Sequence, residues 1–184
     1  LNKQLRTITA LTDTLLTWGS AHLDNFHITL KPVELRDFFQ QQITFFEDNA
    51  KAKKIELINS LSTSFVVEAD ENILSVILRN FISNALKYCS ASDRISIEVQ
   101  NNKDAIVIQV SDTGPGIPKD VLSRLLHSPV QSKTDNTGYK GAGIGLVLCS
   151  ELAKRMNGNI SLKSEPGKGT KAILRFERTT RPTQ

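Results

Sequence analysis

Two pairs of alternating segments limit the folds that this chain can adopt. Residues 94–100 (RISIEVQ) and 105–112 (AIVIQVSD) carry apolar side chains at every second position and are separated by NNKD. This pattern is typical of two antiparallel strands joined by a short turn. Residues 159–164 (NISLKS) and 170–176 (TKAILRF), joined by EPGKGT, repeat the arrangement. The sequence therefore predicts two β-hairpins.

Further strand-like and helical segments precede the first hairpin. KIELINSL (54–61) and SFVVEA (64–69) have the composition of strands, and we interpret the polar residues at 60–64 as a turn. A helix is predicted from Val33 to about Lys53, because apolar residues recur every three or four positions. Those residues are Leu35, Phe38, Phe39, Ile43, Phe46 and Ala50.

Three more helices are expected. Asp70 can cap a helix that continues to Tyr88, Pro118 can open a short helix at its first turn, and the glycine run at 141–145 begins a helix that ends near Met156. Helices and mostly antiparallel hairpins in this order, without βαβ alternation, predict an α+β fold. We expect a two-layer α/β sandwich with a mixed, mostly antiparallel sheet, helices on one face, and an additional N-terminal helix.

The N-terminal segment has an apolar stripe along one helical face. The stripe consists of Leu1, Leu5, Ile8, Leu11, Leu15 and Trp18. Either it packs within its own domain, or it is half of a helical bundle whose other helices are absent from this chain. The helical pattern breaks at 24–32, and FHITLKPVEL (26–35) is interpreted as a linker. Since the pattern begins in mid-helix at Leu1, we expect the chain to be part of a longer protein.

Composition narrows the possible partners. The net charge of +4 and the isoelectric point near 9.1 are only mildly basic, and aromatic residues do not interleave with the lysines, which gives weak support for nucleic acid binding. The same mildly basic net charge is compatible with a small polyphosphate ligand. Cys89 and Cys149 lack metal-type spacing and are interpreted as reduced cytosolic thiols. No apolar run reaches the roughly 20 residues of a membrane helix, and no signal peptide is recognisable.

The helix that ends near Tyr88 carries polar residues where core residues are expected. Positions spaced by three or four share a helical face, so the following side chains are predicted to point toward the core. They are Ile73, Ile77, Asn80, Asn84, Lys87 and Tyr88. Burying an amide costs roughly 1–3 kcal/mol unless it finds a partner. Either the two amides cap neighbouring loops, or a polar ligand satisfies them.

Three glycine-containing motifs follow this helix. In DTGPGIP (112–118) a tight turn places Asp112 where its carboxylate can accept a hydrogen bond from an exocyclic amine. GAGIGL (141–146) opens a helix, so bare backbone N–H groups can face an anion. Its third glycine comes one residue too early for a dinucleotide-binding G-x-G-x-x-G, and no Walker-type GK[ST] motif is present. GKGT (167–170), taken alone, is an ordinary hairpin turn.

Together, in this order and at these separations, the motifs are specific. The chain resembles the sensor histidine kinases of two-component systems, within the gyrase, Hsp90, histidine kinase and MutL ATPase superfamily. RNFISNALKY (79–88) is similar to the N box of that family, and DTGPGIP, GAGIGL and GKGT are similar to its three glycine boxes. The resemblance covers roughly Val33 to Phe176 and implies a Bergerat-type ATP-binding fold.

The resemblance implies roles for individual residues. Asp112 would accept the adenine amino group, Tyr88 would lie against the adenine ring, and Asn84 would bind Mg²⁺. Asn80 and Lys87 would face the phosphates of ATP and form the catalytic pair. The remaining nucleotide contacts implied are Gly114, Gly116, Ile117, Lys133, Lys140, Gly141, Gly143, Gly145, Leu146 and Thr170. Residues 127–140 would form a lid, although its two lysines can equally be solvated loop charges.

The resemblance also implies phosphotransfer rather than hydrolysis. The hydrolysing branches of the superfamily have a glutamate where this chain has Asn80, and a neutral amide cannot act as a general base. The phosphoacceptor histidine of the family is followed by an acidic residue, whereas His22, His27 and His127 are followed by Leu, Ile and Ser. We therefore expect the acceptor to lie upstream of Leu1.

One departure leaves alternatives open. The family lid usually opens with a phenylalanine-rich box, but this chain has Leu126 and Val130 there. A degenerate regulatory module that binds ATP without phosphotransfer is therefore a second hypothesis. A protein-serine kinase of the anti-sigma type shares the motifs, but the apolar stripe at the N-terminus counts against it.

The expected organisation follows from the same resemblance. Residues 1–30 would be the end of a dimerisation and phosphoacceptor hairpin with its linker, 31–178 the ATP-binding catalytic domain, and 179–184 a tail. The implied partners are ATP, a response regulator receiver domain and, in the parent protein, a second copy of the same chain. The catalytic region is expected in the cytoplasm, with or without membrane anchoring of the parent.

Overall fold

The computed structural model describes residues 27–61, 63, 65–125 and 145–177. The elements in this part of the chain follow in order: β1 (Lys31–Glu34), α2 (Leu35–Lys53), β2 (Glu56–Asn59), β3 (Val66–Ala69), α3 (Glu71–Tyr88), β4 (Arg94–Asn101), β5 (Ala105–Asp112), α4 (Lys119–Leu122), α5 (Gly145–Arg155), β6 (Gly158–Glu165) and β7 (Gly169–Glu177). The N-terminal stripe and the whole of the expected lid (127–140) lie outside the described residues.

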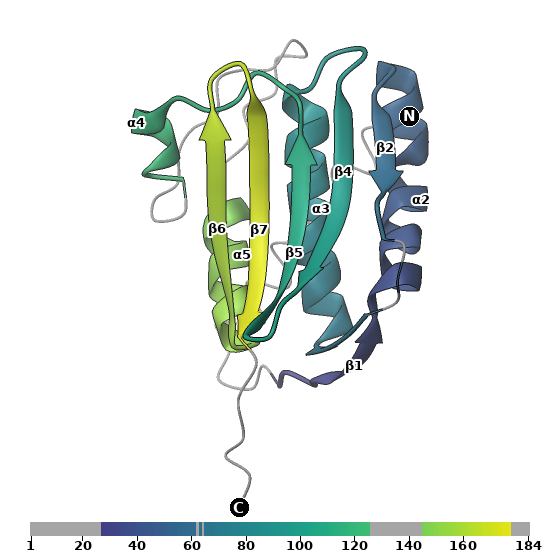
Figure 1. The fold of residues 1–184 in the computed structure, drawn as a ribbon, viewed down its shortest axis with the longest axis vertical. Helices are drawn as coiled ribbons and strands as arrows, with labels where there is room; N and C mark the ends of the chain where they lie inside the picture. Colours follow the sequence, from purple (N-terminus) through teal and green to yellow (C-terminus); the bar gives the residue numbers. More distant parts are fainter. Residues whose placement is uncertain (1–26, 62, 64, 126–144, 178–184) are drawn as a thin grey trace, which may run out of the picture.

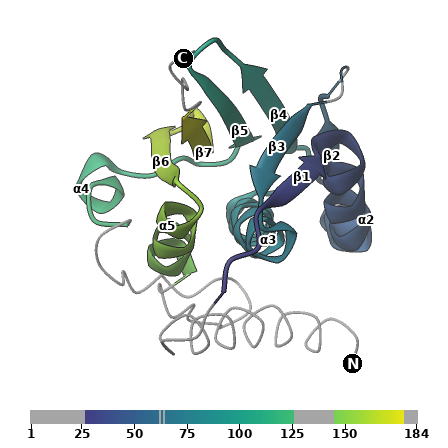
Figure 2. The ribbon, with the colours of Figure 1, turned by 90° about the horizontal axis from the view of Figure 1, so that it is seen from below.

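The main layer is a five-stranded sheet in the order β2-β4-β5-β7-β6. β2 runs parallel to β4, and the other three pairs are antiparallel, so both predicted hairpins are confirmed. Helices α2, α3 and α5 cover one face of this sheet (Figures 1 and 2). The predicted α+β two-layer sandwich with a mixed, mostly antiparallel sheet is therefore confirmed.

The N-terminal part of the fold differs from the prediction. Residues 60–64 do not join a hairpin, because β2 pairs with β4 while β3 pairs antiparallel with β1 in a separate two-stranded sheet. The segment interpreted as a linker thus contains a strand. Four-residue strands carry too few alternating positions for the sequence to reveal their partners.

The two long helices begin where an acidic side chain caps them. Glu34 accepts hydrogen bonds from the backbone N–H groups of Arg36 and Asp37, at 3.1 and 2.8 Å, so α2 begins at Leu35 rather than at Val33. Asp70 accepts from Asn72 and Ile73 at the start of α3, as predicted. Both caps satisfy N–H groups that a helix leaves without an internal partner.

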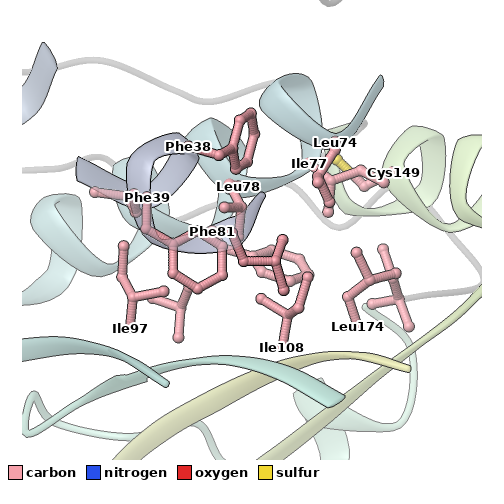
Figure 3. Packing of buried hydrophobic residues seen from close by; sticks show 14 of the residues in the cluster. Phe38, Phe39, Leu74, Ile77, Leu78, Phe81, Ile97, Ile108, Cys149 and Leu174 are labelled. Atoms are coloured by element: carbon pink, nitrogen blue, oxygen red, sulfur yellow. The ribbon is translucent and has the colours of Figure 1, made fainter. Parts of the chain in front are cut away.

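The hydrophobic core lies between the helices and the sheet. Phe39 of α2 and Leu78 of α3 are fully buried against strand residues that include Ile97 and Ile108, and Cys149 of α5 is also fully buried (Figure 3). Since even-numbered residues of β5 face this core, the last of them, Asp112, lies on the helix side of the sheet at the strand end. The core thereby positions a carboxylate beside the C-terminal part of α3.

Candidate functional site

Along the predicted polar face of α3, the residues become more exposed toward the C-terminus of the helix. Ile73 and Ile77 are fully buried, Asn80 and Asn84 are half-buried, and the Tyr88 side chain is 49% exposed. The prediction that all of these residues point toward the core is therefore wrong for Tyr88. Tyr88 is the last residue of α3, so it lies at the end of the helix, beyond the turns that pack on the core.

The two amides of this face bond to each other. The Asn84 Nδ2 group donates to Asn80 Oδ1 at 2.9 Å. Within the described part of the chain, no buried side-chain nitrogen or oxygen lacks a hydrogen-bond partner. The two amides therefore satisfy part of each other's hydrogen-bonding capacity, an arrangement that neither expected alternative, loop capping or a polar ligand, included. Their bond does not use the Asn84 carbonyl oxygen, which is the kind of ligand that Mg²⁺ prefers.

The start of α5 lies against the same amides. A Cβ atom at Gly145 would collide with Nδ2 of Asn80, so any other residue at this position would displace that amide. The first turn of α5 therefore adjoins Asn80, with backbone N–H groups that have no acceptor within the helix and with positive partial charge. Such a terminus is suited to an anion. Four other expected contacts, Lys133, Lys140, Gly141 and Gly143, lie outside the described residues.

Asp112 ends β5 as a half-buried carboxylate. Its Oδ1 atom accepts hydrogen bonds from the backbone N–H groups of Gly114, at 3.0 Å, and Thr170, at 3.1 Å. Burial raises the pKa of this carboxyl, and the negative charge of Asp93 raises it further, while the two N–H groups oppose the shift. Both bonds go to Oδ1, so Oδ2 remains an acceptor for another donor.

Cys89 lies beneath the turn that follows Asp112. A Cβ atom at Gly114 would lie 3.2 Å from Cys89 Sγ and 3.1 Å from Asp112 Oδ1, so the turn packs tightly onto the thiol. Burial raises the pKa of Cys89 to about 12, and the charges of Asp112 and Asp93 add to this shift. The thiol therefore stays neutral beside the carboxylate.

A residue that the sequence analysis missed ties the loop after α3 to this turn. Asp93 accepts a hydrogen bond from the hydroxyl of Thr113 at 2.9 Å and another from the backbone N–H of Ser90 at 2.8 Å. The Thr113 hydroxyl in turn accepts from the N–H of Arg94 at 3.0 Å. The loop and the turn at Asp112 are therefore held together. Asp93 lies outside every motif, so no pattern in the sequence could have found it.

Tyr88 and Lys87 end α3 beside this loop. The Lys87 Nζ atom lies 5.4 Å from the centroid of the Tyr88 ring, a cation–π distance. Figure 1 shows this end of α3 at the same edge of the sheet as the β5 terminus and the β6–β7 turn. An exposed aromatic ring at such an edge offers a flat surface for stacking.

The two turns beyond Asp112 pack against each other through glycines. Gly116 and Gly169 have positive φ, and a Cβ atom at either would collide with a backbone carbonyl oxygen, that of Glu165 or of Asp112 respectively. The N–H of Gly167 donates to Pro115 O at 2.8 Å. The motifs DTGPGIP and GKGT, more than 50 residues apart in the printed sequence, thus form one unit.

Comparison with known proteins identifies the class. Residues 69–180 match the family of histidine kinase-, DNA gyrase B- and HSP90-like ATPases. The chain belongs to this family, as a histidine kinase ATP-binding catalytic domain. The expected α+β fold, family and ATP-binding class are confirmed.

Particular relatives are sensor kinases. The chain is 27% identical over 167 residues to an uncharacterized sensor-like histidine kinase, R01002, of Rhizobium meliloti, covering 90% of this chain and 32% of that protein. It is 30% identical over 147 residues to the circadian input-output histidine kinase CikA of Synechococcus elongatus, covering 78% of this chain and 20% of that protein. The chain therefore spans a minor part of the length of these relatives.

Solved structures share the fold. Full-length ShkA in complex with AMPPNP aligns with a TM-score of 0.78 and 25% identity, over 93% of this chain and 35% of that one. ThkA in complex with the response regulator TrrA aligns with a TM-score of 0.71 and 19% identity, over 97% of this chain and 49% of that one.

Among the described residues, no helix is both long and apolar enough to cross a bilayer.

Two matched substitutions test the close approach of Gly169 to Asp112. Gly167→Ala and Gly169→Ala both place a side chain at positive φ, but a Cβ at Gly167 meets nothing within 4 Å. We expect Gly167→Ala to cost about 1 kcal/mol of unfolding free energy, and Gly169→Ala at least twice as much, because only the latter must displace the Asp112 backbone. Urea denaturation of both variants measures this, and equal losses would contradict the argument.

The raised pKa of Asp112 predicts a pH-dependent stability difference. The folded state binds the Asp112 proton more tightly than the unfolded state, so this group contributes stability at low pH that is lost as pH rises through its raised pKa. Asp112→Asn has no such group. We therefore expect the unfolding free energy of the variant, relative to the wild type, to increase from about pH 4 to pH 7.

Urea denaturation across this range measures the difference. Glu68→Gln, at an exposed strand position, controls for the general loss of a carboxylate. A constant difference between Asp112→Asn and the wild type at every pH would refute the burial argument.

Proposed function

We propose that this chain is the catalytic region of a two-component sensor kinase that transfers the γ-phosphate of Mg-ATP to a histidine upstream of Leu1. The observation that carries the proposal is the meeting of Asn80 and Gly145. It brings the amide face of α3 and the N-terminus of α5 together on the side of the sheet that Asp112, at the end of β5, also faces. An acceptor for an amine, an amide oxygen for a metal and a helix terminus for phosphate thus lie on one face of the sheet.

The adenine end of the proposed site lies between β5 and the end of α3. Asp112 accepts the exocyclic amine with the oxygen that its two backbone bonds leave available. Tyr88 stacks on the ring from the rim. The remaining proposed contacts of the base are Gly114, Gly116, Ile117 and Thr170, which belong to the turns around Asp112, and Leu146, in the first turn of α5.

The phosphate end lies where α3 meets α5. Asn80 and Lys87 face the phosphates, together with the N–H groups of Gly145 and of the glycines that precede it. Asn84 fits Mg²⁺, since its carbonyl oxygen is not used by the bond to Asn80. The metal, when bound, neutralises phosphate charge. Lys133 and Lys140 are proposed as γ-phosphate contacts from the lid.

Transfer is favoured over hydrolysis because the residue beside the helix terminus is an amide. The half-buried Asn80 cannot remove a proton from water, so the site holds ATP for another nucleophile. His27, among the described residues, is exposed and is followed by Ile28, whereas the other two histidines lie outside them. The acceptor is therefore proposed to be on an upstream helix.

The wider organisation is also a proposal. Residues 31–178 form the catalytic domain, 1–30 the end of the dimerisation hairpin and linker, and 179–184 a tail. The likeness to ThkA bound to the response regulator TrrA supports a receiver domain as the partner of the parent protein. Homodimerisation of the parent and a cytoplasmic catalytic region are consistent with the sensor kinases that the chain resembles.

ATP binding and its dependence on Asp112 test the site. Calorimetric titration with ATP should show binding that Mg²⁺ strengthens. Asp112→Asn should weaken it by about 1.5–3 kcal/mol, since a hydrogen bond to a charged acceptor is lost. Asp120→Asn, at an exposed position of α4, is the matched control and should bind normally. Unchanged affinity in Asp112→Asn would place the nucleotide elsewhere.

The location of the acceptor is tested by labelling. Incubation with γ-labelled ATP should leave no acid-labile phosphohistidine on this chain, because none of its histidines has the acidic neighbour of the family acceptor. A longer form of the protein that includes the preceding helix should become labelled. Stable label on this chain alone would contradict the proposal, and ATP binding with no label in the longer form would favour a regulatory module without phosphotransfer.

A further inference from the structure

A row of three polar side chains crosses the end of the sheet on the helix side. Thr170 of β7 pairs with Asp112 of β5 on one side and with Ser164 of β6 on the other. Residues that pair directly across antiparallel strands point to the same face. Val110, two residues before Asp112, is buried in the core, so the row faces the helices and not the outer surface.

The Ser164 hydroxyl makes all of its possible hydrogen bonds within this row and with the turns that adjoin it. Its hydroxyl accepts from the N–H of Ile117 at 2.8 Å, donates to the carbonyl of Gly169 at 2.8 Å, and lies 3.0 Å from the hydroxyl of Thr170. A serine hydroxyl has one proton and two lone pairs. Its proton goes to Gly169 and one lone pair receives Ile117, so the remaining lone pair must accept the proton of Thr170.

The orientation of the Thr170 proton has a chemical consequence. Once Thr170 donates to Ser164, its oxygen has only lone pairs left, and it can accept hydrogen bonds but not donate one. The neighbouring Asp112 carboxylate is also an acceptor when ionised. The sheet edge at Asp112 and Thr170 therefore offers acceptors alone. A base with an amine at this edge is complementary, whereas a base with a carbonyl there meets lone pairs.

We propose that Ser164 is a specificity-determining positioning residue, which makes the site select a purine with an exocyclic amine by holding the Thr170 hydroxyl as an acceptor. The inference rests on the proposed function, since it requires the base to lie at Asp112. Ser164 does not contact the base. It acts through Thr170, and it also holds the DTGPGIP turn through Ile117.

The test compares two nucleotides whose bases differ along one edge. Inosine triphosphate carries a carbonyl where ATP carries the exocyclic amine, and its adjacent ring nitrogen N1 bears a proton that adenine lacks. This second difference is the same for every variant, so the test is the change in selectivity between variants. Calorimetric titration of the wild type with each gives the selectivity as a ratio of affinities. In Ser164→Ala, Thr170 is free to rotate and donate, so we expect the ratio to fall about three- to tenfold. Ser164→Thr retains a hydroxyl and should keep the wild-type ratio.

A double variant separates this role from a structural one. Thr170→Val removes the hydroxyl that Ser164 orients, so adding Ser164→Ala to it should not change the ratio further. An unchanged affinity ratio in Ser164→Ala, including equal weakening of ATP and inosine triphosphate binding, would overturn the inference. So would a further fall in this ratio when Ser164→Ala is added to Thr170→Val. If Ser164→Ala does not fold, Ser164→Cys carries the same test, because a thiol is a weak hydrogen-bonding group of similar shape.

The two proposals fail in different ways. If the wild-type chain does not bind ATP, the proposed function is overturned and this inference with it. If ATP binds and the selectivity of Ser164→Ala equals that of the wild type, only the role of Ser164 is overturned. Thermal melting of each variant shows whether the β6–β7 hairpin has kept its fold.

Discussion

Asp112 is held by two backbone N–H groups that reach it from different parts of the chain. Gly114 belongs to the turn that follows Asp112, and Thr170 belongs to the strand that closes the fold. The bond from Thr170 requires close approach of the β7 backbone, which a side chain at Gly169 would hinder. The orientation of the carboxylate therefore depends on the pairing of β7 with β5.

This arrangement lowers the stability of the folded protein when Asp112 is ionised. Burial disfavours the ionised carboxylate, and the nearby charge of Asp93 adds to the penalty. Asp93 nevertheless holds the loop after α3 to the turn after β5, through Thr113 and Ser90. Asp93 therefore disfavours the ionised form of Asp112 while it fixes the geometry of the site. Such opposition between stability and preorganisation is common where a ligand must be recognised.

The sequence predicted those parts of the fold whose signals are long or local. Eight-residue strands reveal their alternation, and Asp70 reveals its helix through a capping pattern. The four-residue strand β1 was not predicted, and β3 was predicted as a strand but not with its partner, because the pairing of such short strands depends on tertiary contacts. Within the site, motif residues such as Asp112 and Gly145 could be named in advance. Asp93 could not, since a single loop carboxylate has no signature until its partners are known.

The amides of α3 illustrate what a pattern can and cannot establish. Their spacing predicted a polar helix face, and the structure has it, but neither expected alternative included the bond from Asn84 to Asn80. That bond is informative. It directs the Asn84 nitrogen toward Asn80, so the carbonyl oxygen of the same amide takes no part in the pair.

The same logic operates at both ends of the proposed site. Asn80 fixes the Asn84 amide with its nitrogen toward Asn80, and Ser164 fixes the proton of Thr170. Bonds within the protein thereby orient the Asn84 carbonyl oxygen and the Thr170 hydroxyl oxygen as acceptors. In the proposed function these two atoms would face the metal and the amine of the base without first losing an internal partner.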